Sequence, residues 1–393
     1  MKKLALVAAV GMALSGCGGS GDGGSSSPQP AAKPSSAIGT VESVNEAKST
    51  ITVNGYTYRV SEVMYGSKET NLGAVQPNMM VQVGSGTEKS TEEPVVVTLE
   101  PTMTGTVTAI DHINKTFTVN GVELHFEGLS DEIDQGDWVM VSSLPTADAG
   151  YKVLSVVKFD FDYNGPDEIE GRISSIDTNN GTFKLGANVT VSYDRVDGLS
   201  VGEWVEAEGT MQGDVFMATE VEVENYDSLV GDNDVEGIVT WVANDYSQFS
   251  LNYRGNFVVD NATRFEDGTK TDLKQGQEVE VTSVMKNGVR TATEVEIDGP
   301  DFDGDHDSNW QGKEFECEGV VTNYNVNTET FQVSRCENDA DQVMSNNTVV
   351  IDAQTRFEGL EKHNLNGTKV EVEGVIINNQ NVAREVEAES HDD

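Results

Sequence analysis

Short runs in which hydrophobic and polar residues alternate recur along the chain after position 38. In one such run, Val221 and Val223 alternate with Glu220, Glu222 and Glu224. A period of two residues predicts a half-buried β-strand, because successive side chains of a strand point to opposite faces. We therefore expect the valines to face a core and the glutamates to face water. After the first 17 residues, the sequence shows no comparable helical period.

These runs are organised into five repeats. Each repeat begins with a strand that contains a glycine, and these glycines are separated by three steps of 66 residues and a last step of 82. A second glycine precedes the fourth predicted strand of every repeat except the first, where Asn78 stands in its place. Chance does not produce such spacing, so the chain contains five copies of one unit. The first-strand glycines are Gly39, Gly105, Gly171, Gly237 and Gly319, and the fourth-strand glycines are Gly136, Gly202, Gly276 and Gly367.

Each repeat predicts five short strands within about 60 residues, which favours an all-β fold class. A small five-stranded barrel of the OB type fits this pattern best, and a meander sandwich is the alternative. Each barrel should have its own interior and turn its glutamates outward. Because so small a module is marginally stable alone, we expect neighbouring modules to pack or to be cross-linked. The expected modules are residues 38–101, 102–160, 168–226, 234–298 and 315–389, with an acidic linker at 299–314.

The strand motifs resemble those of a family of exported bacterial domains of unknown function. The second strand reads Thr-Phe-x-Val, as in 116–119, and the last strand reads Ala-x-Glu-Val-Glu, as in 383–387. Together with a Gly-x-Val opening and a Gly-x-x-Val-x-Val fourth strand, these motifs cover nearly all of residues 38–389. The resemblance implies a barrel-like β module of envelope lipoproteins, and it brings no catalytic residue or ligand.

The first 17 residues resemble the signal peptide of bacterial lipoproteins. Lys2 and Lys3 precede the apolar run Leu4–Leu14, which is too short to span a membrane. The run leads into Leu-Ser-Gly-Cys17, which looks like the lipobox in which the cysteine becomes the acylated N-terminus. The resemblance implies a signal peptide at 1–17 and lipidation of Cys17, in the outer membrane if the source has two membranes. A simple secretory signal with an incidental cysteine is the alternative. Residues 18–37 predict a flexible tether.

The chain is strongly acidic, with 67 acidic and 25 basic residues and a net charge of −42. A surface with this charge repels phosphate groups, which argues against nucleic acid as a partner, and it attracts cations. The hydrophobic content of 37% is that of a folded protein, so disorder along the whole chain is not expected.

The three cysteines separate into a lipid site and a pair. If Cys17 carries lipid, Cys317 and Cys336 remain, and such a pair in an exported protein indicates a disulfide. A hairpin whose turn is centred between Val326 and Asn327 would place the two cysteines directly opposite each other. We expect this disulfide to stabilise the last module by about 3 kcal/mol. Two free thiols in a reducing compartment are the alternative.

An acidic stretch between the fourth and fifth repeats is the candidate metal site. Its carboxylates alternate with other residues, and such a loop can coordinate Ca²⁺. Ser308 stands where an EF-hand has glycine, however, and no flanking helices are predicted, so a solvated acidic linker is the competing interpretation. The candidate ligands are Asp301, Asp303, Asp305, Asp307, Asn309 and Glu314.

Candidate catalytic residues are scarce, because the sequence contains none of the common catalytic motifs and its five histidines are scattered. Trp138 and Trp204 occupy equivalent positions in their repeats, which favours packing over a sugar-binding platform. We expect no enzymatic activity, and no cofactor apart from Ca²⁺ at the acidic stretch. The sequence indicates a binding or spacer protein of the cell envelope, with the membrane, divalent cations and an envelope protein or glycan as partners. An OB-like binder of glycans or other oligomers is the alternative.

Overall fold

The computed structural model describes residues 33–84, 94–159, 165–186, 188–229, 231–297, 314–338 and 342–389. Regular structure in these ranges consists of β-strands and of 3-10 helices of three residues each. None of the helices in this part of the chain is long and apolar enough to cross a bilayer. The short helices are η1 (Glu46–Lys48), η2 (Leu72–Ala74), η3 (Val196–Gly198), η4 (Tyr226–Ser228), η5 (Lys270–Asp272) and η6 (Lys362–Asn364).

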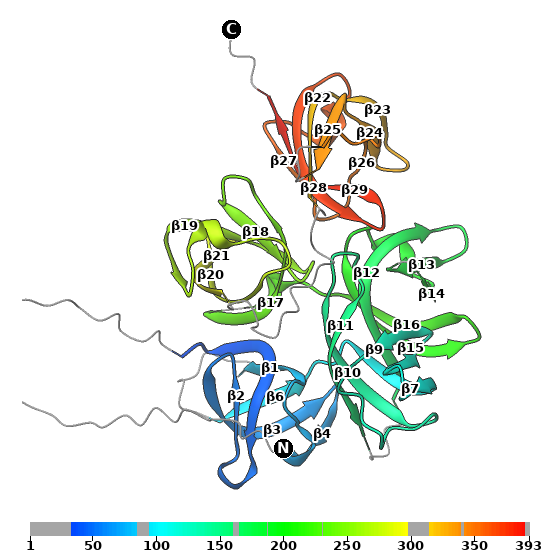
Figure 1. The fold of residues 1–393 in the computed structure, drawn as a ribbon, viewed down its shortest axis with the longest axis vertical. Coiled ribbons are helices and arrows are strands. Elements are labelled where there is room, and N and C mark those ends of the chain that lie inside the picture. Colours follow the sequence, from blue (N-terminus) through cyan, green and yellow to red (C-terminus); the bar gives the residue numbers. More distant parts are fainter. Residues whose placement is uncertain are drawn as a thin grey trace, which may run out of the picture. The chain divides into compact units, whose positions relative to one another are not determined.

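The strands follow the five predicted repeats, called modules 1 to 5 below (Figure 1). Module 1 contains β1 (Ser36–Asn45), β2 (Thr50–Val53), β3 (Tyr56–Tyr65), β4 (Lys68–Thr70), β5 (Met80–Gly84) and β6 (Val95–Leu99). Module 2 contains β7 (Met103–Asp111), β8 (Thr116–Val119), β9 (Val122–His125), β10 (Trp138–Pro145) and β11 (Tyr151–Lys158). Module 3 contains β12 (Asp167–Asp177), β13 (Thr182–Leu185), β14 (Val189–Ser192), β15 (Trp204–Gln212) and β16 (Val215–Val223).

Modules 4 and 5 complete the series. Module 4 contains β17 (Asn233–Val242), β18 (Gln248–Leu251), β19 (Gly255–Glu266), β20 (Glu278–Lys286) and β21 (Val289–Ile297). Module 5 contains β22 (Glu314–Val320), β23 (Thr322–Asn325), β24 (Thr330–Gln332), β25 (Arg335–Asn338), β26 (Thr348–Val350), β27 (Arg356–Glu358), β28 (Lys369–Ile377) and β29 (Gln380–Ala388).

Modules 1, 3, 4 and 5 close into five-stranded barrels. In module 4, β17 pairs with β18 and β20, β18 pairs with β19, and β20 pairs with β21, all in antiparallel ladders. A parallel ladder between β19 and β21 completes the ring. Modules 1 and 3 repeat this order, including the parallel ladder. In module 5, β22 and β23 together take the place of the first strand, β24, β26, β28 and β29 complete the ring, and a parallel ladder joins β26 to β29. The predicted all-β, OB-like fold is therefore confirmed, and the crossed strand order excludes a simple meander.

Module 2 departs from this closed pattern. Strand β7 pairs with β8 and β10, and β10 pairs with β11, but within the described residues no ladder joins β9 to β11. Instead, β7 pairs with β12 of module 3, and one hydrophobic core runs through both modules. Phe117 of module 2 and Phe183 of module 3 both lie in that core. The expectation of a separate interior for every module is therefore wrong for this pair.

The first-strand glycine makes room for a side chain near the end of the second strand. In module 4, a Cβ atom on Gly237 would lie 2.2 Å from Nδ2 of Asn252. The Asn252 amide fills that space: its Oδ1 accepts from the backbone N–H of Ile238 at 2.8 Å, and its Nδ2 donates to the carbonyl of Glu236 at 3.2 Å. Glycine is thus required by a close approach between two neighbouring strands.

The other modules satisfy the carbonyl that precedes this glycine in related ways. Asn54 and Asn120 donate to it in modules 1 and 2, and the Ser334 hydroxyl does so in module 5. In module 3 the corresponding residue is Gly186, and the donor comes from another module: the Tyr151 hydroxyl of β11 donates to the carbonyl of Glu170. Module 2 therefore supplies the hydrogen-bond donor for a backbone carbonyl of module 3.

The five modules also pack on one another, as expected for units of this size. A hydrophobic cluster contains residues of every module, among them Met80, Ala147, Trp204, Tyr253 and Val382. Strand β1 pairs in parallel with β17, which joins module 1 to module 4. Burial of such apolar surface between modules adds to the stability that each small core provides.

The predicted disulfide is present in module 5. Cys317 of β22 and Cys336 of β25 are directly paired in an antiparallel ladder, and a bond joins their sulfur atoms. Their Cα atoms are 4.0 Å apart. The pairing of these two cysteines, predicted from a hairpin in the last repeat, is therefore confirmed.

Candidate functional site

The turn between β18 and β19 of module 4 inserts into the junction with modules 2 and 3. The Tyr253 hydroxyl donates to the carbonyl oxygens of Thr146 and Ala147, at 3.2 and 3.0 Å, in the β10–β11 hairpin. The Tyr253 ring stacks on Trp204 of module 3, with the centroids 6.1 Å apart and the planes 3° from parallel. This turn therefore docks module 4 onto two other modules at once.

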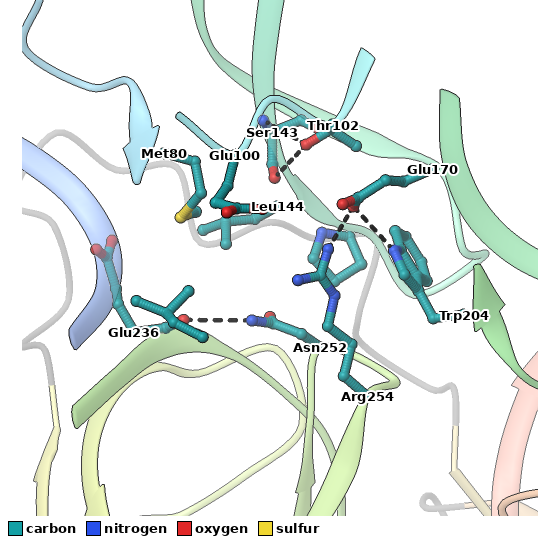
Figure 2. Close-up of a pocket in the computed structure, with 12 residues that line it drawn as sticks. Met80, Glu100, Thr102, Ser143, Leu144, Glu170, Trp204, Glu236, Asn252 and Arg254 are labelled. Atoms are coloured by element: carbon teal, nitrogen blue, oxygen red, sulfur yellow. Dashed lines mark hydrogen bonds and ion pairs between the residues drawn. The ribbon is translucent and has the colours of Figure 1, made fainter. Parts of the chain in front are cut away.

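Arg254, the next residue of the turn, pairs with a buried carboxylate. Its guanidinium contacts Oε2 of Glu170, and the same oxygen accepts a hydrogen bond of 3.0 Å from the indole N–H of Trp204 (Figure 2). The guanidinium carbon also lies 6.0 Å from the centre of the Trp204 ring, within the range of a cation–π interaction. The three side chains form one connected unit across the junction.

Both tryptophans singled out by the sequence pack against neighbouring modules. Trp204 is 3% exposed and belongs to the shared cluster. Trp138 packs against the core of module 1, where its ring lies 6.3 Å from that of Tyr65, and its indole N–H donates to Asp167 at 3.2 Å. The packing interpretation is confirmed, and the surface that they cover lies between modules.

Five glutamates gather at this junction, and we call them the junction glutamates. Glu168 and Glu170 of β12 are 7% and 3% exposed, and a carboxylate oxygen of each lies within 4.8 Å of one from Glu206 of β15. The expectation that the modules turn their glutamates outward is wrong here, because the outer face of β12 is covered by other modules. The junction glutamates are Glu100, Glu168, Glu170, Glu206 and Glu224.

Burial shifts the titration of these carboxyl groups. Burial, reinforced by the negative charge of Glu170, raises the pKa of Glu100 to about 8. The same two causes raise the pKa of Glu206 to about 8. Burial also raises the pKa of Glu168 well above its ordinary value, although the hydrogen bond from Tyr65 opposes this rise. Glu100, Glu168 and Glu206 therefore hold their protons more tightly than exposed glutamates do.

The spacing of these carboxylates would suit a divalent cation, but their partners indicate another arrangement. Glu168 already accepts a hydrogen bond from Tyr65 at 3.0 Å, and Glu170 accepts from Trp204 and Arg254. The guanidinium of Arg254 supplies positive charge where a metal ion would otherwise be needed. We therefore name no metal ligand among the junction glutamates, because hydrogen bonds and the charge of Arg254 already satisfy Glu168 and Glu170.

A small cavity opens beside the Glu170–Arg254 pair. Its volume is about 20 Å³, which has room for one or two water molecules. Pockets that hold organic ligands are larger by an order of magnitude. Figure 2 shows Glu100, Ser143, Glu170 and Arg254 around this space, one residue from each of modules 1 to 4. This cavity can therefore hold water but has no room for a sugar.

The sequence-predicted site residues fall in different parts of the chain. Cys17 and the acidic residues at 301–309, namely Asp301, Asp303, Asp305, Asp307 and Asn309, lie outside the described residues. Glu314 begins β22 and pairs with Val375 of β28. The junction glutamates were not predicted, because in sequence they resemble the other glutamates that alternate with apolar residues.

The comparison with known families agrees with the repeated barrels. A search of curated proteins gives no significant match. The model of the family described as Domain of unknown function (DUF5666) matches the chain five times, at residues 38–86, 104–151, 170–222, 236–296 and 318–387. These matches cover more than half of the chain and fall on the five modules. The chain therefore belongs to the DUF5666 family and carries five copies of its domain in tandem.

Proposed function

We propose that the protein is a non-catalytic scaffold of the cell envelope, anchored by lipid on Cys17, whose packed barrels present an anionic surface to cations. The proposal rests on the burial of strand β18 in module 4. Its four residues are all buried, so both faces of the strand are covered. In OB folds the second and third strands form the ligand face, and here that face of module 4 serves packing instead.

Residues of module 5 contact β18 from outside the barrel of module 4. Gln248 of β18 donates to Glu385 of β29 at 3.4 Å and accepts from Arg356. The backbone N–H of Asn244 donates to Glu373 at 3.2 Å. A surface that other barrels use for ligands is thus an internal contact, which favours a structural role for the tandem array.

The outer surface supports the cation-binding part of the proposal. The closing strands expose rows of carboxylates, such as Glu220 and Glu222 of β16 and Glu387 of β29. With 67 acidic and 25 basic residues, this surface concentrates divalent cations by a screened electrostatic attraction. The acidic stretch from Asp301 to Glu314 is the place where we expect the tightest Ca²⁺ binding.

The lipid anchor is tested by labelling cells that express the full chain with a fatty acid. The wild type should carry the label and sediment with membranes, whereas Cys17→Ala should lose both properties because the acyl acceptor is gone. Cys317→Ala, which removes a cysteine of the disulfide, should keep the label. A labelled, membrane-bound Cys17→Ala protein would contradict the anchor.

Cation binding is tested by calorimetry and thermal unfolding. Millimolar Ca²⁺ should bind with a Kd of about 10⁻⁴ to 10⁻³ M and raise Tm, and a chelator should reverse the rise. Asp303→Asn/Asp305→Asn should lose most of the rise, whereas Glu220→Gln should retain it. An unchanged Tm in the wild type would contradict a calcium site.

A glycan array tests the second candidate, an OB-like glycan binder. The OB-like strand order favours it, because related barrels bind oligosaccharides on the second and third strands. Part of that surface is exposed outside module 4, for example at Lys184 of β13. Specific glycan binding that is lost in Lys184→Glu would replace the scaffold proposal, and an empty array would support it.

A further inference from the structure

The first strands of modules 1 to 4 pair with one another along one edge. In the residues just before the first-strand glycine, β1 pairs with β17 and β7 pairs with β12, so each of these ladders joins two modules. In the second contact, the backbone N–H of Glu170, the residue before Gly171, donates to the carbonyl of Thr102 at 2.9 Å. The first strand of a module therefore presents an edge of hydrogen-bonding groups that another first strand can cover.

In module 5 the same edge is covered from within the module. Strand β25 pairs with β22 from Phe315 to Glu318, which are the residues directly before Gly319 (Figure 1). On its other edge β22 pairs with β28, as the first strands of the other modules pair with their fourth strands. Strand β25 therefore occupies the place that another module takes on modules 1 to 4.

The backbone of β22 faces β25 in the way that Glu170 faces module 2. The Cα atoms of Cys317 and Cys336 are 4.0 Å apart, which is nearer to the spacing of a non-hydrogen-bonded pair than to that of a hydrogen-bonded pair. The neighbouring residues Glu316 and Glu318 therefore direct their backbone N–H and C=O groups toward β25. Glu318 and Glu170 each precede the first-strand glycine of their module, so the two edges correspond residue by residue.

Strand β25 belongs to an insertion that distinguishes module 5. In the other modules the second and third strands are joined by short turns, at residues 54–55, 120–121, 186–188 and 252–254. In module 5, residues 333–347 separate β24 from β26. The disulfide ties this insertion to β22, and Cys317 and Cys336 are both 1% exposed. A cross-linked extra strand is a durable way to keep an edge from pairing with another chain.

We propose that β25 is an edge cap, which takes the place of a neighbouring module's first strand and prevents β22 from pairing with β22 of a second copy of this chain. A second copy is the partner that fits, because the first strands of the other four modules already pair with one another. This inference goes beyond the scaffold function and does not depend on the lipid anchor or on cation binding.

The strength of the latent contact follows from its size and charge. The ladders between β1 and β17 and between β7 and β12 comprise three and two residue pairs. Such short ladders suffice within one chain, because linked modules are present at a high effective concentration. Between separate chains this advantage is lost, and Glu316 and Glu318 of the two edges repel each other. Uncapped chains should therefore associate weakly, and more strongly where salt screens the repulsion.

The test compares the full chain with an uncapped variant by sedimentation velocity. In the uncapped variant Asn-Gly replaces residues 334–346, which keeps Phe331 opposite Val349 and gives module 5 the kind of turn found at residues 120–121 of module 2. The variant also carries Cys317→Val, because Cys317 would otherwise be a free thiol and Val235 has the same position in module 4.

All proteins in this test carry Cys17→Ala, so that no acyl group contributes to association. At about 100 µM protein and about 0.5 M NaCl, the uncapped variant should sediment as a dimer with twice the mass of the capped protein. At low salt its dimer should dissociate.

Glu316→Pro in the uncapped variant is the matched control. Proline lacks the backbone N–H that would donate across the exposed edge of β22, and its ring blocks the approach of another strand there. Because this N–H points away from β28, the ladder inside the barrel remains. This variant should have the mass of the capped protein.

Two outcomes would overturn the cap. One is an uncapped variant that unfolds cooperatively and keeps the mass of the capped protein at high salt. The other is equal association with and without Glu316→Pro. If the uncapped variant fails to fold, Cys317→Val/Cys336→Val/Glu337→Pro is measured instead, because it releases β25 without shortening the chain. It should associate more than the capped protein, and an unchanged mass would overturn the proposal as well.

Discussion

At the scale of single residues, an asparagine that follows the second strand explains why the first strand contains glycine. Asn54, Asn120 and Asn252 adopt positive φ values of 49°, 48° and 53°, a region that asparagine tolerates better than most residues. Gly186 has the same backbone conformation, with φ of 53°. Module 3 therefore has the backbone for an asparagine but relies on Tyr151 of module 2.

Replacing the Tyr151 hydroxyl by an asparagine amide at position 186 tests this interpretation. Tyr151→Ala should destabilise the protein by about 3 kcal/mol or more, because it removes a packed ring and the hydrogen bond to the carbonyl of Glu170. Gly186→Asn in that background should recover about 1 kcal/mol, because the amide can then reach the same carbonyl. Denaturant unfolding measures both changes. The idea fails if the double variant is no more stable than Tyr151→Ala.

A methyl group on Gly237 should be costly for a related reason. The added Cβ atom would lie 2.2 Å from Nδ2 of Asn252, and moving the amide away would break its hydrogen bonds to Ile238, Tyr226 and Glu236. We expect Gly237→Ala to lower the free energy of unfolding by about 1–3 kcal/mol. Gly198→Ala is the matched control, because no atom lies within 4 Å of its Cβ position. Equal stability of the two variants would contradict the close-approach argument.

At the scale of strands, alternation predicted which face lies toward the barrel and could not predict what covers the other face. In β16, Val221 packs on the core and Glu220 and Glu222 are exposed, as predicted. The end of the strand differs, because Val223 is 38% exposed while burial raises the pKa of Glu224. There the chain leaves its own barrel and enters the junction with module 4.

Strand β12 shows the same limit more clearly. Its sequence Asp-Glu-Ile-Glu-Gly resembles a strand with one wet face, yet Glu168 and Glu170 are as buried as Ile169. The covering side chains, Tyr65 and Arg254, lie far away in the sequence. A single sequence gives no signal for such partners, so the fold was predictable and the junction was not.

The disulfide of module 5 allows a prediction at the same scale. Cys317 and Cys336 are 19 residues apart, and closing a loop of this size in the unfolded chain should contribute about 3 kcal/mol. Cys317→Ser/Cys336→Ser should therefore unfold at lower denaturant concentration, with the loss confined to module 5. Wild-type protein with reductant should behave in the same way. Insensitivity of the unfolding midpoint to reductant would contradict a stabilising disulfide.

At the scale of the whole molecule, the contacts between modules are charged as well as apolar. Asp352 of module 5 is fully buried and pairs with Arg172 of module 3 and Arg384 of its own module. The adjacent backbone N–H of Ala353 donates to the carbonyl of Val201 at 2.9 Å. Module 5 thus docks on module 3 through a carboxylate held between two guanidinium groups.

This contact should depend on pH. Burial alone would raise the pKa of Asp352, but the positive charges of Arg384 and Arg172 outweigh it and hold the pKa below its usual range. Its contribution is therefore present above the ordinary aspartate value of 3.8 and is lost as the pH falls through the lower value of the folded state. Acid should therefore loosen the docking of module 5.

Asp352→Asn tests this contact. An amide cannot balance two buried guanidinium groups, so we expect a loss of about 3–5 kcal/mol at pH 7 and weaker docking of module 5. Thermal unfolding and X-ray scattering would detect these changes. As the pH falls from the ordinary aspartate value of 3.8 through the lower pKa of the folded state, the wild type should progressively lose its advantage over the variant. Glu358→Gln breaks an exposed pair with Arg356 and should cost less than about 1 kcal/mol. If Asp352→Asn matched Glu358→Gln, the two buried arginines would have to be compensated by other groups, and the docking of module 5 would not depend on the charge of Asp352.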